Sequence, residues 1–235
     1  MLNFIRIFVK GLPMRFIHLT DLHASNPDKK NYFSKRALGL LSWTKRRQFQ
    51  HSNQFLEVLI DDIKREDPDL IVITGDIVQL GTELEIQSAK NWLLELFGDL
   101  PIMIVPGNHD NYSRDSFKFL LRYWSEFLHV FPEFPSVRQF KNLTLVGLMS
   151  AQPMPFWSAR GDLGERQLAK LKTILSENIS KNIKNSIILS TDNYYKCGLV
   201  SKLLSKIIYC YFDRHISFNF NLLDRDINFI LKNNF

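Results

Sequence analysis

The sequence contains very little cysteine. Cys197 and Cys210 are the only two among 235 residues, and they match neither a zinc-site spacing nor a disulfide framework. This scarcity excludes the small disulfide-stabilised secreted proteins and is typical of a chain in a reducing compartment. Long hydrophobic runs are also lacking, since none reaches the ~18–20 apolar residues that a membrane-spanning helix needs. A cytoplasmic location is therefore predicted.

A continuous basic stripe is lacking as well. The formal net charge of +6 is compatible with an anionic substrate, but the basic residues are scattered. Their tightest cluster is 45–47, which we interpret as a solvated loop face; contact with a substrate anion or with lipid headgroups is the alternative. Loose contact with nucleic acid or lipid headgroups is equally compatible with this charge, but the sequence predicts no dedicated nucleic-acid surface.

Residues 1–13 lack the apolar core and the small-residue cleavage site of a secretory signal, and Arg6 and Lys10 interrupt them. Two interpretations remain open for this segment. It is an N-terminal extension before a domain that starts at Met14, or a short amphipathic segment in weak peripheral contact with a membrane. We favour the extension, because a strand pattern begins directly after Met14.

Apolar segments with strand and helix periodicity alternate through the first two thirds of the chain. Thr82 and Glu85 form the pattern of a capping box at the start of one helix. The helix from residue 52 is expected to turn Phe55, Val58, Leu59, Asp62 and Ile63 inward. The alternation predicts a layered α/β protein with a largely parallel sheet. Strands are predicted over 15–20, 70–74, 102–105, 137–140, 143–148 and 186–190, and helices over 52–67, 82–97, 113–130 and 163–179.

Three short polar motifs directly follow the first three predicted strands. They are Asp21-Leu22-His23, Gly75-Asp76 and the run 107–110, which reads Gly-Asn-His-Asp. Ligands bind at the carboxyl ends of parallel strands, so these side chains are expected to converge. Carboxylate and imidazole donors together suit Mn, Fe, Zn or Ni, and two such ions suit phosphoester hydrolysis.

The same motifs carry a resemblance to a known family. The segments 16–23 (FIHLTDLH), 72–78 (VITGDIV) and 105–110 (VPGNHD) resemble the first three motifs of the calcineurin-like metallophosphoesterases. The chain looks most similar to the bacterial predicted phosphohydrolases of the cyclic-nucleotide phosphodiesterase-like branch. The resemblance implies an α/β/β/α sandwich. It also implies a metal-dependent phosphoester hydrolase with a dinuclear metal centre and a metal-bound hydroxide.

The resemblance assigns metal ligands residue by residue. Asp21 and His23 would hold the first divalent ion, Asp76 would bridge the two ions, and Asn108 would hold the second. A carboxylate between two dications stays ionised and offsets their repulsion.

The third motif would also carry catalysis and substrate binding. Asn108 and His109 would contact the substrate phosphate, and His109 would act as the acid or as a stabiliser of the transition state. Asp110 would orient the imidazole of His109. The substrate would be a small phosphoester.

The chain departs from the family after Ser190. Family members supply further histidines there, including a Gly-His-x-His motif, whereas Thr191–Tyr194 contains none and His215 is the only later histidine. We therefore expect the domain over 14–190 to be incomplete at its C-terminus and only one of the two ions to be retained. Residues 191–235 are expected to be a divergent tail, and a frameshift near Thr191 would explain it.

Two other functions remain open. The first is a non-catalytic remnant or pseudoenzyme that binds an anion or a partner, which the missing histidines favour. The second is a peripheral lipid-processing hydrolase that uses residues 1–13 and the 45–47 cluster at a membrane. An unfinished sheet would expose an edge, so self-association is also predicted.

Three other histidines have no ligand spacing. His18 lies within the first predicted strand and is expected in the core. His51 precedes a helix and is expected to help cap it. His129 lies near a helix end, where the helix dipole favours positive charge.

Overall fold

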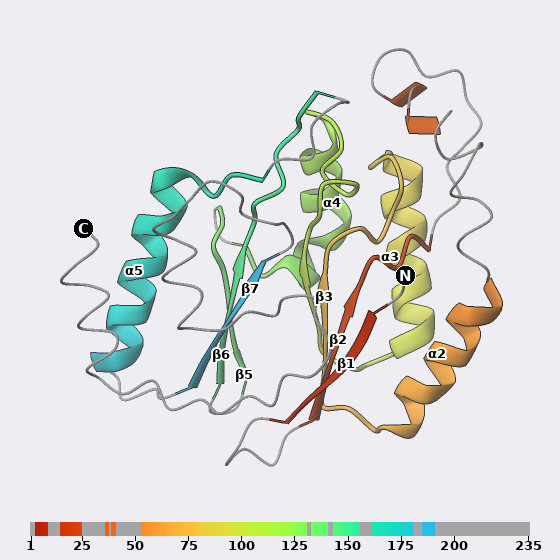
Figure 1. Ribbon diagram of the computed structural model, residues 1–235, viewed down its shortest axis with the longest axis horizontal. Coiled ribbons are helices and arrows are strands. Elements are labelled where there is room, and N and C mark those ends of the chain that lie inside the picture. The colour runs from red at the N-terminus through yellow and green to blue at the C-terminus, as the bar shows by residue number, and fades with distance from the viewer. Residues whose placement is uncertain are drawn as a thin grey trace.

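The computed structural model describes residues 3–8, 15–24, 36–37, 39–40, 53–130, 133–140, 143–155, 161–180 and 185–190. Their strands form two sheets, one in the order β1-β2-β3-β4 and one in the order β5-β6-β7. Figure 1 shows these sheets side by side, with helices on their outer sides. The elements are β1 (Asn3–Phe8), β2 (Arg15–Thr20), α2 (Asn53–Arg65), β3 (Leu70–Thr74), α3 (Glu83–Phe97), β4 (Ile102–Val105), α4 (Ser116–Leu128), β5 (Ser136–Phe140), β6 (Leu143–Leu148), α5 (Gly164–Ser180) and β7 (Asn185–Ser190).

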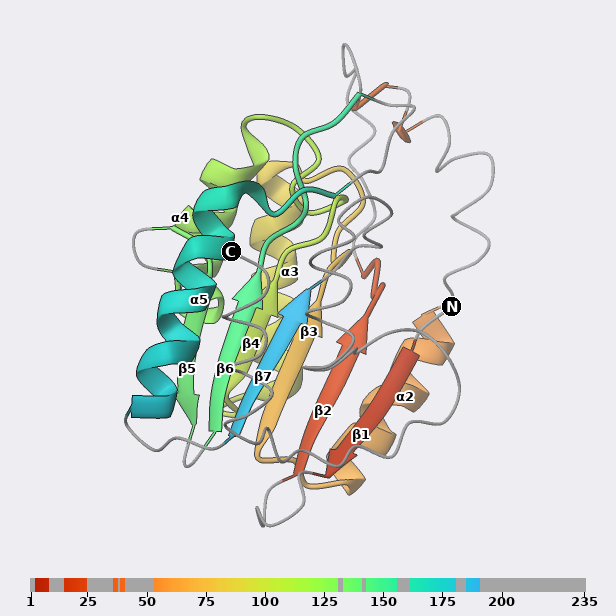
Figure 2. The same cartoon turned by 60° about the vertical axis from the view of Figure 1, so that its left-hand side comes forward.

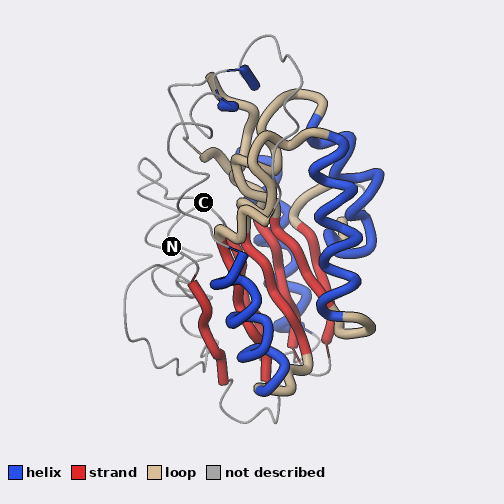
Figure 3. Tube along the Cα trace, turned by 90° about the vertical axis from the view of Figure 1, so that its right-hand side faces the viewer, coloured by secondary structure: helices blue, strands red, loops and turns tan. Residues whose placement is uncertain are grey.

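The first sheet is built from β-α-β units. Strands β2, β3 and β4 are parallel neighbours, and helices α2 and α3 connect them along the chain. Their carboxyl ends consequently lie at one end of the sheet, to which the arrowheads of β2 and β3 point in Figure 2. The loops that follow the strands gather at this same end (Figure 3). The predicted parallel arrangement is therefore confirmed.

Part of the N-terminal segment belongs to this sheet. Strand β1 pairs antiparallel with β2, with Ile5 opposite His18. Residues 3–8, which lie within the predicted N-terminal extension, thus form the edge strand of the first sheet. Apolar and β-branched residues in this stretch favour a strand, and the edge of β2 offers the partner. The domain boundary at Met14 stays a prediction.

The second sheet confirms the predicted hairpin. Strands β5 and β6 pair antiparallel from Ser136 opposite Gly147 to Phe140 opposite Leu143. Strand β7 then pairs parallel to β6, and α5 is the connecting helix. In Figure 1, α5 lies on the outer side of this sheet.

Two apolar clusters hold the layers together. One joins the first sheet to helices α2, α3 and α4. It includes Ile71 and Ile104 of the sheet, Ile63 of α2, Leu93 of α3 and Trp124 of α4. The other lies between the two sheets and includes Phe16, Val72, Met103, Leu145 and Leu189. The described elements thus form an α/β protein with parallel β-α-β units; the complete four-layered sandwich stays a prediction.

Two predictions concern the start of helix α3 and the inward face of helix α2. The capping box of α3 is confirmed, with reciprocal hydrogen bonds between Thr82 and Glu85. The inward face predicted for α2 is wrong in part: Val58 is 61% exposed, and Asp62 is exposed too. Ile60 is buried beside Ile63, because the inward stripe of this helix is rotated from the expected one.

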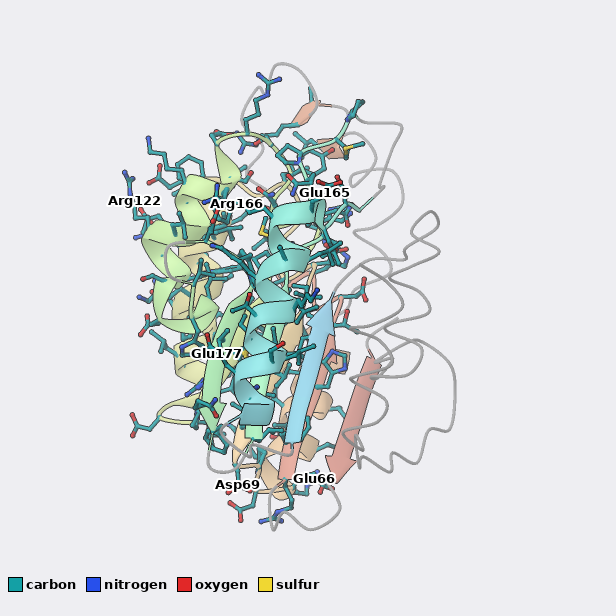
Figure 4. All side chains as sticks on the ribbon, turned by 90° about the vertical axis from the view of Figure 1, so that its left-hand side faces the viewer. Glu66, Asp69, Arg122, Glu165, Arg166 and Glu177 are labelled. Atoms are coloured by element: carbon teal, nitrogen blue, oxygen red, sulfur yellow. The ribbon has the colours of Figure 1, made fainter. Side chains whose placement is uncertain are left out.

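The opposite end of the first sheet is closed by polar contacts. The Arg15 backbone N–H donates to Asp69 at 2.8 Å, and its guanidinium pairs with Asp67 at 2.7 Å. Asp69 and Glu66 lie at this end in Figure 4, far from the loops that follow the parallel strands.

No helix in the described part of the chain is both long and apolar enough to cross a bilayer.

His129 corrects an expectation. It caps α4 in the left-handed conformation, with φ of 51°. Burial, together with the charge of Arg138, lowers the pKa of its imidazole. Loss of hydration and the neighbouring guanidinium both disfavour the positively charged form of this imidazole. His51 lies outside the described residues.

His18 is a core residue, as predicted. Its Nε2 lies 2.6 Å from Thr74 Oγ1, and burial lowers the pKa of its imidazole to about 4. In the unfolded chain this imidazole takes up a proton near its ordinary pKa of about 6.5, whereas in the folded chain it stays neutral at that pH. The stabilising effect of the neutral ring is consequently complete above that pKa and is lost as the pH falls toward 4.

Replacing His18 by asparagine is expected to reduce the acid sensitivity of the fold. The side chain of His18 should account for about 2 kcal/mol of the unfolding free energy lost between about pH 7.5 and pH 5. Urea unfolding of the wild type and of His18→Asn at both pH values gives this difference directly. Parallel pH profiles of the two proteins would contradict it.

Candidate metal centre

Three side chains from two strand ends meet at the carboxyl end of the first sheet. Asp21 and His23 follow β2, and Asp76 follows β3; one potential ligand atom from each lies within 4.8 Å of the others. All three residues are half-buried. The structure therefore brings together three of the four predicted metal ligands.

The backbone at these three residues is unusual. Asp21, His23 and Asp76 have φ of 55°, 43° and 55°, in the left-handed region that residues other than glycine seldom adopt. Such conformations cost of the order of 1 kcal/mol each and persist only where the surroundings enforce them. Their coincidence at the convergence point makes this loop pair a candidate functional site.

Hydrogen bonds between the two loops enforce this conformation. The Asp21 N–H donates to Gly75 O at 3.2 Å, and the His23 N–H donates to Asp76 O at 2.9 Å. These bonds continue the pairing of β2 with β3 beyond the ends of the strands. Neither strand motif predicts this continuation of the pairing.

The third motif reaches Asp76 because position 107 is glycine. A Cβ at Gly107 would lie 2.6 Å from Asp76 N and 2.8 Å from Gly75 Cα. No side chain fits there, so the loop after β4 can approach the loop after β3. The N–H of His109 then donates to Asp76 Oδ1 at 2.9 Å.

The imidazole of His109 lies beside the three converging side chains. Its centroid is 5.0 Å from that of His23, with the rings edge to face. Its Nδ1 is 2.7 Å from the carbonyl oxygen of Gln79. Because a carbonyl oxygen only accepts, Nδ1 carries the proton, and Nε2 is the acceptor of the neutral ring.

Asp110 does not play the expected role. It is fully buried, and its carboxyl group accepts the backbone N–H groups of Ile77, Val78 and Gly107 at 2.9–3.0 Å. Burial, and then the charge of Asp76, raises the pKa of Asp110 to about 8 against the opposing effect of these hydrogen bonds. Asp110 therefore anchors two loops, and the Gln79 carbonyl, not Asp110, orients the ring of His109.

Thr20 is a neighbour of these side chains that the sequence motifs do not include. Its hydroxyl lies 2.8 Å from both Asp21 Oδ2 and Thr74 O, so it links the first ligand to β3. Ligating carboxylates typically have such outer hydrogen bonds. A threonine directly before the Asp21 motif was the available signal.

Asn108 is half-buried in the loop between Gly107 and His109. Its role as a ligand and phosphate contact stays a prediction. His215 and the tail from Thr191 lie outside the described residues, as does the predicted frameshift.

The donor set fits a divalent transition ion. Two carboxylates and one imidazole give two negative charges and mixed oxygen and nitrogen donors, as Mn, Fe, Zn and Ni accept. The three groups come from elements that hydrogen bonds hold together, so the site is largely formed by the fold. Among the described residues, the three converging groups account for one ion, and Asn108 is the candidate that remains for a second.

Comparison with known protein families adds an independent observation. The family described as Calcineurin-like phosphoesterase matches residues 14–196, which is most of the chain and includes all three motifs. No curated protein matches the chain.

Proposed function

The chain belongs to the calcineurin-like phosphoesterase family, whose members are phosphoric ester hydrolases, and we propose that it hydrolyses small phosphoesters at the centre described above. The convergence of Asp21, His23 and Asp76 within 4.8 Å is the observation that carries this proposal. A surplus of six positive charges suits an anionic substrate.

The ligands divide between two ions. Asp21, His23 and Asp76 would hold one divalent ion, and Asp76 with Asn108 would hold the second. Bound divalent ions would supply Lewis-acid activation of water and of the phosphoryl group. Thr20 keeps the Asp21 carboxylate in place through its hydroxyl.

His109 is the residue suited to handle the proton of the leaving group. The Gln79 carbonyl accepts the Nδ1 proton, so Nε2 would be the atom that exchanges a proton with substrate. The same carbonyl stabilises the ring when both nitrogens are protonated. The hydrogen bond from the His109 N–H to Asp76 fixes the distance between this residue and the ligands.

One observation favours a second, non-catalytic function. The sequence from residue 191 to the end contains a single histidine, His215, and no Gly-His-x-His motif. A non-catalytic remnant that binds an anion or a partner would account for that absence. Self-association and weak membrane contact are further proposals, which gel filtration and vesicle pelleting address.

Metal content and turnover of the purified full chain separate these functions. The chain is loaded with Mn²⁺, freed of excess ion and assayed with bis-p-nitrophenyl phosphate before and after chelator treatment. We expect bound Mn²⁺ and turnover, with turnover lost in chelator and restored by the ion. A chain that holds no ion and shows no turnover would establish the non-catalytic alternative.

A further inference from the structure

We propose that Glu85 is a positioning residue for His109 and acts on the imidazole through the peptide group that joins Gln79 to Leu80. Its effect on hydrolysis rests on the function proposed above. Its effect on the ring of His109 does not, because that effect follows from contacts within the folded chain.

Glu85 is a buried carboxylate that gathers backbone amides. It is 3% exposed, and its oxygens accept the N–H groups of Gln79, Leu80 and Thr82 at 3.1–3.3 Å. The capping box of α3 requires only the contact with Thr82. The contacts with Gln79 and Leu80 lie outside the helix, so Glu85 does more than cap it.

The peptide group between residues 79 and 80 connects the carboxylate to the imidazole. A trans peptide is planar, and its N–H and C=O point in opposite directions. Both Glu85 oxygens lie within 3.3 Å of the Leu80 N on one side. On the other side, the Gln79 oxygen lies 2.7 Å from His109 Nδ1. The hold of Glu85 on the N–H therefore sets the direction of the carbonyl.

The connection is also electrostatic. A negative charge that accepts the Leu80 N–H polarises the peptide group and makes the Gln79 oxygen a stronger acceptor. Two effects thus favour the proton on His109 Nδ1: the position of the acceptor and its strength. Nε2 is consequently presented as the exchanging nitrogen.

The adjacent backbone amides are bound by a second buried carboxyl group, that of Asp110. Asp110 accepts the N–H groups of Ile77 and Val78. The next two residues along the chain, Gln79 and Leu80, donate their N–H groups to Glu85. The loop after Asp76 is therefore held by two buried carboxyl groups. Asp110 holds the part next to the ligands, and Glu85 holds the part next to the His109 ring.

Replacing Glu85 by glutamine tests the proposal, because the substitution removes the negative charge and leaves only one of the two oxygens to accept amide N–H groups. The matched control is Glu83→Gln, the same substitution in the first turn of the same helix. Glu83 is partly exposed and bonds to Arg122 and Tyr123, not to the loop. The readout is the pair of ¹⁵N imidazole signals of His109 in the labelled full chain, identified with His109→Gln.

In the wild type and in Glu83→Gln, we expect the neutral ring of His109 to carry its proton on Nδ1. In Glu85→Gln, we expect its signals to shift toward a mixture of tautomers. Where the chain is active, kcat should fall 10- to 100-fold in Glu85→Gln with KM within about twofold, the range seen when groups behind a site are removed.

Unchanged ¹⁵N signals of His109 in a folded Glu85→Gln chain would overturn the proposal, whether or not the chain hydrolyses phosphoesters. An inactive wild type with a shifted tautomer in the variant would leave the positioning role established and the proposed function refuted. If Glu85→Gln does not fold, Glu85→Asp takes its place. The side chain of Glu85→Asp is shorter by one methylene, which moves the carboxylate away from the loop and should shift the ¹⁵N signals of His109. Wild-type ¹⁵N signals in Glu85→Asp would count against the proposal.

Discussion

Replacing Asp76 by asparagine should abolish metal retention and lower kcat/KM for a phosphodiester by at least about 100-fold. Asp76 supplies one of the three converging ligand atoms, and its Oδ1 also accepts the N–H of His109. Asparagine has an oxygen that can keep this hydrogen bond, but it lacks the negative charge that two cations require. The substitution thus removes the charge and leaves the scaffold.

Metal content per chain and turnover of bis-p-nitrophenyl phosphate measure the effect together. The matched control is Asp99→Asn, the same substitution at an exposed position that follows α3. It should retain wild-type metal content and turnover. Full metal content and turnover in Asp76→Asn would show that hydrolysis takes place elsewhere on the chain.

Much of the fold could be predicted because each parallel strand carries its own signal. Continuous apolar runs such as 70–74 and 102–105 mark strands covered on both faces, and all five residues of β3 are buried. Pairing at the sheet edge could not be predicted this way. Strand β1 forms because β2 offers a free edge, and that edge is a property of the folded sheet.

The site could be predicted at the level of residue types at strand ends. Asp21, His23 and Asp76 converge because parallel strands place their carboxyl ends together. Their left-handed backbone was not predictable, because it results from hydrogen bonds between two loops far apart in sequence. Propensity alone would have argued against such a conformation at three residues other than glycine.

Asp110 shows why a role inferred from neighbours in sequence can fail. Its position next to His109 suggested that its carboxylate orients the imidazole. The carboxylate instead accepts three backbone N–H groups, and the ring is held by a carbonyl from another loop. Adjacency in the sequence therefore did not predict the hydrogen-bond partners of either side chain.

Replacing Asp110 by alanine should therefore act on stability first. Three buried N–H groups would lose their acceptor, and each unsatisfied group costs about 1–3 kcal/mol. A buried carboxylate with this many partners also leaves a cavity when removed. We expect the free energy of unfolding to fall by about 3–5 kcal/mol, measured by urea denaturation of the metal-free chain.

The matched control for this loss is Asp115→Ala. The carboxylate of Asp115 is 49% exposed and pairs with Arg36 at 3.0 Å, so its removal should cost less than about 1 kcal/mol. The comparison separates the two roles considered for Asp110. A chain with wild-type stability and greatly reduced kcat would restore the catalytic role. A large loss of stability, with residual turnover in proportion to the folded fraction, is the result expected of a carboxylate that holds the loops after β3 and β4 together.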